Sequence, residues 1–324
     1  MVRFGIIGLG IIAARFAALL NKIEGVELIS VASRDMSRAE AFAQKHGAKK
    51  YYDSYSQLIQ DDEVDVIYIA VTHNTHFEIA KECLEKGKGV ICEKPLVLNR
   101  RDAEELARLS KEKNVLLMEA MWTRFIPTFR KAREWVAEGK IGQVKLVNAS
   151  FCFNFPYDPK NRLYDPNAAG GSLYDAGVYP IEFATGILDE VPSQVSGLAT
   201  FSKTGVDDFA VVNLSFESGA LASLSCGITA NTSMDARVYG TEGNIVVYSF
   251  LGSKKCELYD NSNNLVESFE IEFDDGFMYE IEHFRDLYLN GQIESSIISH
   301  RDSIACADIF DKLMEQWGKG REEI

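Results

Sequence analysis

A turn built from Gly8-x-Gly10-x-x-Ala13 separates an apolar run from a stretch with helical periodicity near the start of the chain. Glycines in such a turn let backbone N–H groups approach a pyrophosphate, and the N-terminus of the following helix adds its positive end. A plain strand-to-helix turn needs the same glycines, but the strand and the helix on either side favour dinucleotide binding. We therefore expect this turn, with Ile11 and Ile12, to hold a dinucleotide.

The end of the next expected strand carries the residues that choose between NAD and NADP. An acidic residue there holds the ribose 2′-hydroxyl of NAD, whereas an arginine accommodates the 2′-phosphate of NADP. Ser33 and Arg34, with Arg38 one helical turn later, can donate hydrogen bonds to a phosphate. Asp35 would select NAD if the register differed by one residue. We predict that NADP is preferred and that NAD remains possible.

Polar residues also follow a later strand. Thr72, Asn74 and His76 stand where the carboxyl edge of a sheet is expected, and their side chains can hydrogen-bond ribose and phosphate groups. His76 could alternatively begin a helix and pack on the sheet. Neither His73 nor His76 has a cysteine or carboxylate partner at metal-ligand spacing, so we expect no metal site.

A second polar turn is Glu93-Lys94-Pro95. Proline restricts the backbone of Lys94 to an extended conformation, so the lysine on this stiff turn would point into a cofactor cleft. A charged pair on a surface turn explains the same three residues. Spacing alone does not decide between the two interpretations.

The elements that must position these turns alternate regularly over the first 120 residues. Apolar strands are expected at 2–7, 26–32, 64–71, 89–92 and 115–118, with amphipathic helices at 11–22, 38–46, 76–86 and 101–113. Apolar strands that alternate with helices predict a parallel sheet covered on both faces, which right-handed crossovers make doubly wound.

The pattern changes after about residue 125. Segments with alternating polarity follow at 144–153, 194–201, 209–216, 221–228, 236–239, 244–248, 257–259 and 265–271, and a helix is expected over residues 172–186. We predict an α/β plus α+β fold. A Rossmann domain over residues 1–122 binds the dinucleotide, and a domain over residues 123–324 with an open-faced, mainly antiparallel sheet binds substrate and forms an oligomer.

The composition narrows the function classes. The 324 residues carry 34 Lys and Arg against 48 Asp and Glu, a net charge of −14, which argues against a nucleic-acid or anionic-membrane partner. No run approaches the roughly 20 apolar residues of a transmembrane helix, and glycines interrupt the apolar N-terminus, which favours a buried strand over a signal peptide. Six isolated cysteines are typical of reduced thiols, so we expect a cytoplasmic protein.

Taken together, these motifs resemble the Gfo/Idh/MocA oxidoreductase family over essentially the whole chain. The resemblance extends to Gly170–Pro180, which reads GGSLYDAGVYP. The segment Met118–Phe125 is similar to the subgroup that contains dimeric dihydrodiol dehydrogenase and NADP-dependent D-xylose 1-dehydrogenase. The resemblance implies hydride transfer between a nicotinamide cofactor and a hydroxyl or carbonyl, on a sugar or a related cyclic diol.

The resemblance also implies roles for individual residues. Lys94 corresponds to the lysine near the reacting oxygen, on a turn whose Lys94–Pro95 bond is expected to be cis, and Asp175 to the aspartate of the second motif. Much of the family has histidine four residues later, where this chain has Tyr179. In the dihydrodiol dehydrogenase subgroup this tyrosine donates and accepts the proton. Taken alone, Tyr179 would more simply be a buried aromatic residue with a hydrogen-bonded hydroxyl.

Further expectations follow for the cleft and the assembly. Glu93, Trp122 and Arg124 are expected to line the cofactor site, and Phe155 and Arg162 the substrate pocket beside the tyrosine. A homodimer or larger homo-oligomer is expected through the open face of the second sheet. Two alternatives stay open, namely an anhydrosugar or dicarbonyl reductase on the same fold and a non-catalytic regulator that senses dinucleotides.

Overall fold

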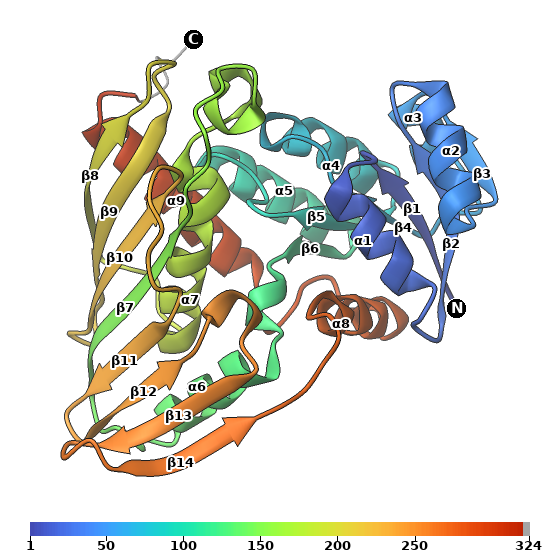
Figure 1. Cartoon of the computed structure of the whole chain (residues 1–324). Helices are drawn as coiled ribbons and strands as arrows, with labels where there is room; N and C mark the ends of the chain where they lie inside the picture. The colour runs from blue at the N-terminus through green and yellow to red at the C-terminus, as the bar shows by residue number, and fades with distance from the viewer. Residues whose placement is uncertain (320–324) are drawn as a thin grey trace. The chain divides into compact units, whose positions relative to one another are not determined.

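The computed structural model describes residues 1–319, which form two compact units. The first unit consists of residues 1–97, 101–120 and 277–303, and the second of residues 98–100, 121–276 and the described residues from 304 onward. Each unit is built around a sheet of its own (Figure 1). Within the described residues, none of the helices combines the length and the apolar character needed to span a membrane.

A parallel sheet lies at the centre of the first unit, in the order β3-β2-β1-β4-β5-β6. Its strands are β1 Val2–Ile7, β2 Val26–Ala32, β3 Lys50–Tyr52, β4 Val66–Ile69, β5 Gly89–Glu93 and β6 Leu117–Ala120. This order is that of doubly wound nucleotide-binding folds, so the predicted fold class is confirmed. Strand β3 is missing from the sequence prediction because its residues are polar or only partly buried and form no apolar run.

Helices connect the strands of this sheet: α1 Ile11–Leu20, α2 Met36–His46, α3 Tyr55–Ile59, α4 His76–Glu85 and α5 Arg100–Lys113. Helix α8, Phe277–Leu289, comes from far along the chain and packs beside α1 against β1 (Figure 1). Phe284 of α8 and Phe16 of α1 both contact Phe4 of β1, each with ring centroids 6.0 Å apart. Burial of these rings explains why α8 belongs to the first unit.

The second unit has a mainly antiparallel sheet in the order β14-β13-β12-β11-β7-β10-β9-β8, in which β7 and β10 are parallel. Its strands are β7 Val144–Cys152, β8 Gln194–Phe201, β9 Asp207–Ser215, β10 Leu221–Gly227, β11 Ala236–Gly240, β12 Gly243–Val247, β13 Lys255–Asp260 and β14 Leu265–Glu270. Helices α6, Pro127–Ala137, and α7, Val178–Leu188, pack on it, and Gln316 at the end of α9, His300–Gln316, bonds to β8.

Alternation along the strands gives this sheet one covered face. In β9, Ala210, Val212 and Leu214 are 1%, 2% and 2% exposed, whereas Val211, which lies between Ala210 and Val212, is 42% exposed. Side chains on successive residues of a strand point to opposite faces, so the second face is open within the described chain. The predicted open-faced sheet is therefore confirmed.

One element of the second unit differs from the prediction. The single helix that is expected over residues 172–186 begins as a π-helical turn, Leu173–Gly177, and continues as α7 from Val178. Single π-helical turns are uncommon and often occur at functional sites. This turn lies in the motif that carries Asp175 and Tyr179.

Candidate active site

The glycine turn between β1 and α1 leaves the start of α1 open. Gly8 has φ +85°, and a Cβ there would lie 2.5 Å from a backbone carbonyl oxygen just past β4, so the turn requires glycine. A Cβ at Gly10 would meet nothing within 4 Å among the described residues, and no side chain in that part of the chain caps α1. Ile11 and Ile12 are exposed, whereas Ala13 is buried. Uncapped N–H groups at this accessible helix start suit a diphosphate.

In the turn after β2, the Asp35 side chain caps the start of helix α2. The Asp35 carboxylate accepts hydrogen bonds from the Ser37 hydroxyl at 2.6 Å and from the Arg38 backbone N–H at 3.2 Å. The Ser37 hydroxyl is the main reason that the pKa of Asp35 lies below its ordinary value. The Arg38 guanidinium donates to the backbone carbonyl between the two motif glycines at 2.7 Å. A cationic group therefore lies beside the glycine turn, with buried Ser33 and exposed Arg34 just before it.

His76, after β4, contacts the neighbouring turn that contains Pro95. His76 is fully buried, and burial lowers its pKa, so the ring is neutral near pH 7. Its Nδ1 lies 2.9 Å from the Pro95 carbonyl oxygen and its Nε2 lies 3.3 Å from that of Val71. A neutral ring has one N–H, and the shorter distance assigns it to Nδ1. Thr72 and Asn74 are exposed at the same edge.

The Lys94–Pro95 peptide bond is cis, as the sequence comparison with the family predicts. Glu93 before it is buried and accepts a hydrogen bond from the Tyr68 hydroxyl of β4. Burial raises the pKa of the Glu93 carboxyl. Lys94 itself is partly exposed at the end of β5. The turn is therefore anchored on the sheet by the residue that precedes its lysine.

In the second unit, the Tyr179 hydroxyl oxygen accepts a hydrogen bond from the Trp122 indole N–H at 3.4 Å. The Phe151 ring of β7 meets the Tyr179 ring edge-on, with centroids 5.4 Å apart and planes at 80°. Tyr179 is 9% exposed, so packing fixes its ring while part of the residue stays accessible. Trp122 begins a short 3₁₀ turn, Trp122–Arg124, far from Tyr179 in sequence.

Asp175 pairs with an arginine from the loop that follows β7. The Arg162 Nη1 lies 3.1 Å from Asp175 Oδ1; the Arg162 side chain is 54% exposed and that of Asp175 is 12% exposed. Phe155, from the same loop, packs on a buried cluster, and its carbonyl accepts a bond from the Tyr164 hydroxyl at 2.9 Å. Arg162 therefore presents a cation at the motif that holds Asp175.

Asp207 at the start of β9 is a residue that the sequence prediction missed. Its Oδ2 accepts bonds from the Ser172 hydroxyl at 2.6 Å and from the Leu173 N–H at 2.7 Å, where the π-helical turn begins. A Cβ on Gly171, whose φ is +119°, would lie 2.3 Å from Asp207 Oδ1. Burial raises the pKa of Asp207. Aspartate is uncommon in strands, so its presence at the start of β9 is the one signal in the sequence that could have pointed to Asp207.

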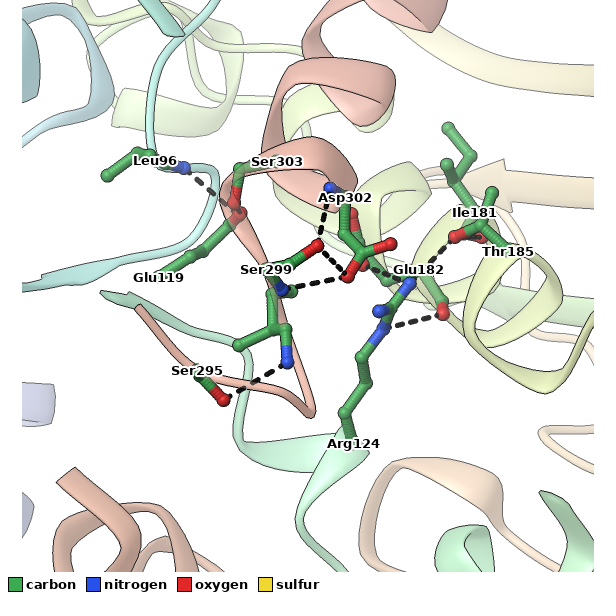
Figure 2. Close-up of polar contacts among 11 residues, drawn as sticks. Leu96, Glu119, Arg124, Ile181, Glu182, Thr185, Ser295, Ser299, Asp302 and Ser303 are labelled. Atoms are coloured by element: carbon green, nitrogen blue, oxygen red, sulfur yellow. Dashed lines mark hydrogen bonds and ion pairs between the residues drawn. The ribbon is translucent and has the colours of Figure 1, made fainter. Parts of the chain in front are cut away.

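Arg124 is buried in the second unit, and its guanidinium group points toward Glu182 and Thr185 of α7 (Figure 2). Its Nη2 lies 2.7 Å from Glu182 Oε2 and donates to Thr185 Oγ1 at 2.8 Å, while Nε donates to the Glu182 carbonyl at 3.0 Å. Arg124 is expected to line the cofactor site; in the structure its side chain is 2% exposed. Arg124 instead joins the 3₁₀ turn to α7.

The structure thus collects two sets of residues, one in each unit. The four turns of the first unit follow the carboxyl ends of β1, β2, β4 and β5, which meet at one edge of the parallel sheet. The second set consists of Trp122, Asp175, Tyr179 and Arg162. Among residues 1–319, no group of three or more His, Cys, Asp or Glu side chains is arranged to hold a metal ion.

Comparison with known families matches both parts of the chain. Residues 2–121 match the Gfo/Idh/MocA oxidoreductase family with its NAD-binding Rossmann fold, and residues 129–246 match the Gfo/Idh/MocA C-terminal domain. The chain is 34% identical over 325 residues to trans-1,2-dihydrobenzene-1,2-diol dehydrogenase from Xenopus laevis, with 98% of each protein covered.

Solved structures show the same architecture. A 3-ketoreductase from Actinomadura kijaniata, in complex with NADP and TDP-benzene, is 26% identical with a TM-score of 0.87 and 97% of each chain covered. Levoglucosan dehydrogenase, in complex with NADH and levoglucosan, is 22% identical with a TM-score of 0.86, covering 98% of this chain and 97% of that one. The second likeness shows the fold alone.

Proposed function

The chain belongs to the Gfo/Idh/MocA oxidoreductase family, and we propose that it is an NADP-preferring enzyme that interconverts a hydroxyl and a carbonyl on a sugar or related cyclic diol. The relative at 34% identity is named for a cyclic diol, which supports that substrate class. The ketoreductase was solved with NADP, which supports the cofactor. The reaction is then of the D-xylose 1-dehydrogenase or trans-dihydrodiol dehydrogenase type.

The observation that carries this proposal is the setting of the Tyr179 hydroxyl. Its oxygen receives the Trp122 N–H, and Phe151 packs against its ring. Asp175, four residues earlier, is paired with an accessible Arg162. A phenol with a fixed ring and an oriented oxygen suits proton transfer, which requires a defined distance to the substrate oxygen.

The residues of this chain divide the work as follows. Tyr179 takes the proton of the substrate hydroxyl in oxidation and returns it in reduction. Lys94 stabilises the negative charge that develops on the same oxygen, and Asp175 accepts a hydrogen bond from a neighbouring substrate hydroxyl. NADP, when bound, supplies the nicotinamide that accepts or returns the hydride, and its diphosphate is held at the open start of α1.

The NADP preference is supported by the turn after β2. The Asp35 carboxylate is engaged by the first turn of α2, whereas Arg38 places a cation beside the glycine turn. A 2′-phosphate gains charge-assisted bonds from such a cation, and a bare ribose does not.

The proposal extends to the whole protein. Residues 1–122 bind the dinucleotide, and residues 123–324 bind substrate and form an oligomer through the open sheet face, where Leu198 is 82% exposed. All six cysteines are buried free thiols, which suits the reducing cytoplasm.

A substrate screen tests the proposal. The purified protein is incubated with NADP or NAD and a panel of aldopentoses, aldohexoses and trans-dihydrodiols, and in reverse with NADPH and dicarbonyls or anhydrosugars. Substrate-dependent change in absorbance at the wavelength of NADPH, faster with NADP than with NAD, is expected. Cofactor binding without turnover on the whole panel would contradict the proposal and favour a dinucleotide-sensing regulator.

A further inference from the structure

The side chain of Glu119, on β6, accepts a hydrogen bond from the backbone two residues after Lys94. Its Oε1 accepts the Leu96 backbone N–H at 3.0 Å, and its Oε2 accepts the Ser303 hydroxyl at 2.5 Å (Figure 2). Glu119 is 2% exposed and Leu96 is 4% exposed. Both carboxyl oxygens accept a hydrogen bond inside the protein, where such bonds are strong, so both donors are held in defined positions.

The bond to Leu96 has a counterpart on the other side of the same peptide group. The Pro95 carbonyl and the Leu96 N–H are two ends of one peptide unit, and His76 of α4 donates to that carbonyl at 2.9 Å. A peptide unit is planar and rigid. Two buried side chains from different elements therefore fix the orientation of the plane between Pro95 and Leu96.

The sheet register explains how Glu119 reaches this peptide. Strands β5 and β6 are parallel neighbours, with Cys92 opposite Glu119 and Glu93 opposite Ala120. Glu119 therefore lies on β6 one residue before the level at which the chain leaves β5. The Glu119 carboxylate is then within hydrogen-bond distance of the turn that carries Lys94, although the two residues are remote in sequence.

We propose that Glu119 is a positioning residue, which together with His76 fixes the Pro95–Leu96 peptide plane and so holds the Lys94 ammonium at its working position. The inference rests on the proposed function, since that position matters if Lys94 acts on the substrate oxygen. Glu119 is 2% exposed, so it has almost no surface with which to contact a ligand. It acts through the backbone of the turn, because a displacement of about 1 Å in a catalytic group can cost roughly 100-fold in rate.

A double-mutant cycle tests this role. Turnover is measured for Glu119→Ala, Glu119→Gln, Lys94→Met and the double variant Glu119→Ala/Lys94→Met, at enzyme concentrations that make the slowest rate measurable. Glu119→Ala is expected to lower kcat about 10- to 100-fold, while Glu119→Gln, which keeps an acceptor for Leu96, stays within about threefold. The double variant should be no slower than Lys94→Met within about threefold, because groups that act as a unit are not additive.

The exposed Glu112 on α5 provides the matched control, since Glu112→Ala removes a carboxylate of 53% exposure from the same unit. It should leave turnover unchanged. A Glu119→Ala loss that multiplies with the Lys94→Met loss, or equal losses in Glu119→Ala and Glu119→Gln, would overturn the proposal. Multiplication would indicate general damage to the fold, and equal losses would indicate a role for the charge alone.

A second measurement needs no turnover and separates failure of this inference from failure of the proposed function. The rate of reductive methylation of the Lys94 amine is followed by peptide mass spectrometry. In Glu119→Ala this rate should change at least threefold, while that of exposed Lys145 stays constant. An unchanged Lys94 rate would overturn the positioning role, whether or not the wild-type protein turns over any substrate.

Discussion

At the scale of single residues, Arg38 joins two turns of the cofactor edge through its bond to the glycine turn. We predict that Arg38→Ala or Arg34→Ala erodes the NADP preference by about 10- to 100-fold in kcat/KM relative to NAD, the loss of one charge-assisted contact of about 1.5–3 kcal/mol. Arg108→Ala, which removes an exposed arginine of the same unit, is the control. A wild-type enzyme that uses NAD better than NADP would show the assignment to be wrong.

Replacing Trp122 removes the hydrogen bond to the Tyr179 hydroxyl and leaves the tyrosine in place. An N–H donor to the phenolic oxygen favours the phenolate, so Trp122→Phe should move the tyrosine-dependent limb of the pH–kcat/KM profile to higher pH. Turnover near neutral pH in oxidation should fall about 2- to 12-fold, the worth of one neutral hydrogen bond. Trp317→Phe is the matched control, because its indole N–H donates to the Gly197 carbonyl instead. An unshifted profile in Trp122→Phe would contradict the contact.

The residue types of the site could be predicted from short motifs, but their partners could not. Trp122 and Tyr179 are 57 residues apart, and Ser172 and Asp207 are 35 apart. Side-chain pairs at such separations are created by the fold and leave no local pattern. For the same reason Arg124, a residue of the motif Met118–Phe125, proved to be buried with Glu182.

At the scale of elements, the first residue of the π-helical turn Leu173–Gly177 donates its backbone N–H to Asp207, which lies on strand β9. Asp207→Ala should lower kcat about 10- to 100-fold by releasing the segment that carries Asp175 and Tyr179, with NADP affinity within about twofold of wild type. Asp207→Asn keeps an acceptor for both donors and should retain most activity. Equal losses in both variants, or a loss confined to NADP affinity, would contradict the positioning role.

The same carboxyl gives a prediction for stability against pH. Burial raises the pKa of Asp207 in the folded state above its pKa in the unfolded chain. The contribution of this carboxyl group to the free energy of unfolding is therefore fully present below pH about 4 and is lost as pH rises through the folded-state pKa. The neutral Asp207→Asn variant lacks this loss. Its Tm relative to wild type should therefore increase from pH 4 to pH 8. A relative Tm that decreases over this range would show the assigned direction to be wrong.

Most elements could be predicted because their periodicity is strong, as for β1 and β2, whose bounds match the sequence prediction. The exceptions have a physical cause. Strand β3 is short and polar and depends on pairing with β2. The residues of the π-helical turn would suit an ordinary α-helix equally well. Its geometry depends instead on the bonds to Asp207 and on the close approach of the Gly171 backbone to the Asp207 side chain.

At the scale of the whole molecule, the open face of the second sheet exposes apolar side chains. Leu198, Leu221 and Val211 are 82%, 53% and 42% exposed. Contact with a second copy would remove this surface from water. We predict a dimer or larger assembly by light scattering at micromolar concentration, and dissociation in Leu198→Asp. A wild-type mass equal to one chain would contradict this prediction.

The central claim is that Tyr179 carries the proton of an NADP-dependent reaction, and the comparison of wild type with Tyr179→Phe tests it most directly. The variant keeps the ring and its packing on Phe151 and loses the hydroxyl. With the best substrate of the screen, kcat should fall about 10²- to 10⁴-fold, the usual worth of a general acid–base group. NADP affinity and Tm should stay nearly constant. A Tyr179→Phe enzyme that turns over at the wild-type rate would contradict the claim and make Asp175 the candidate.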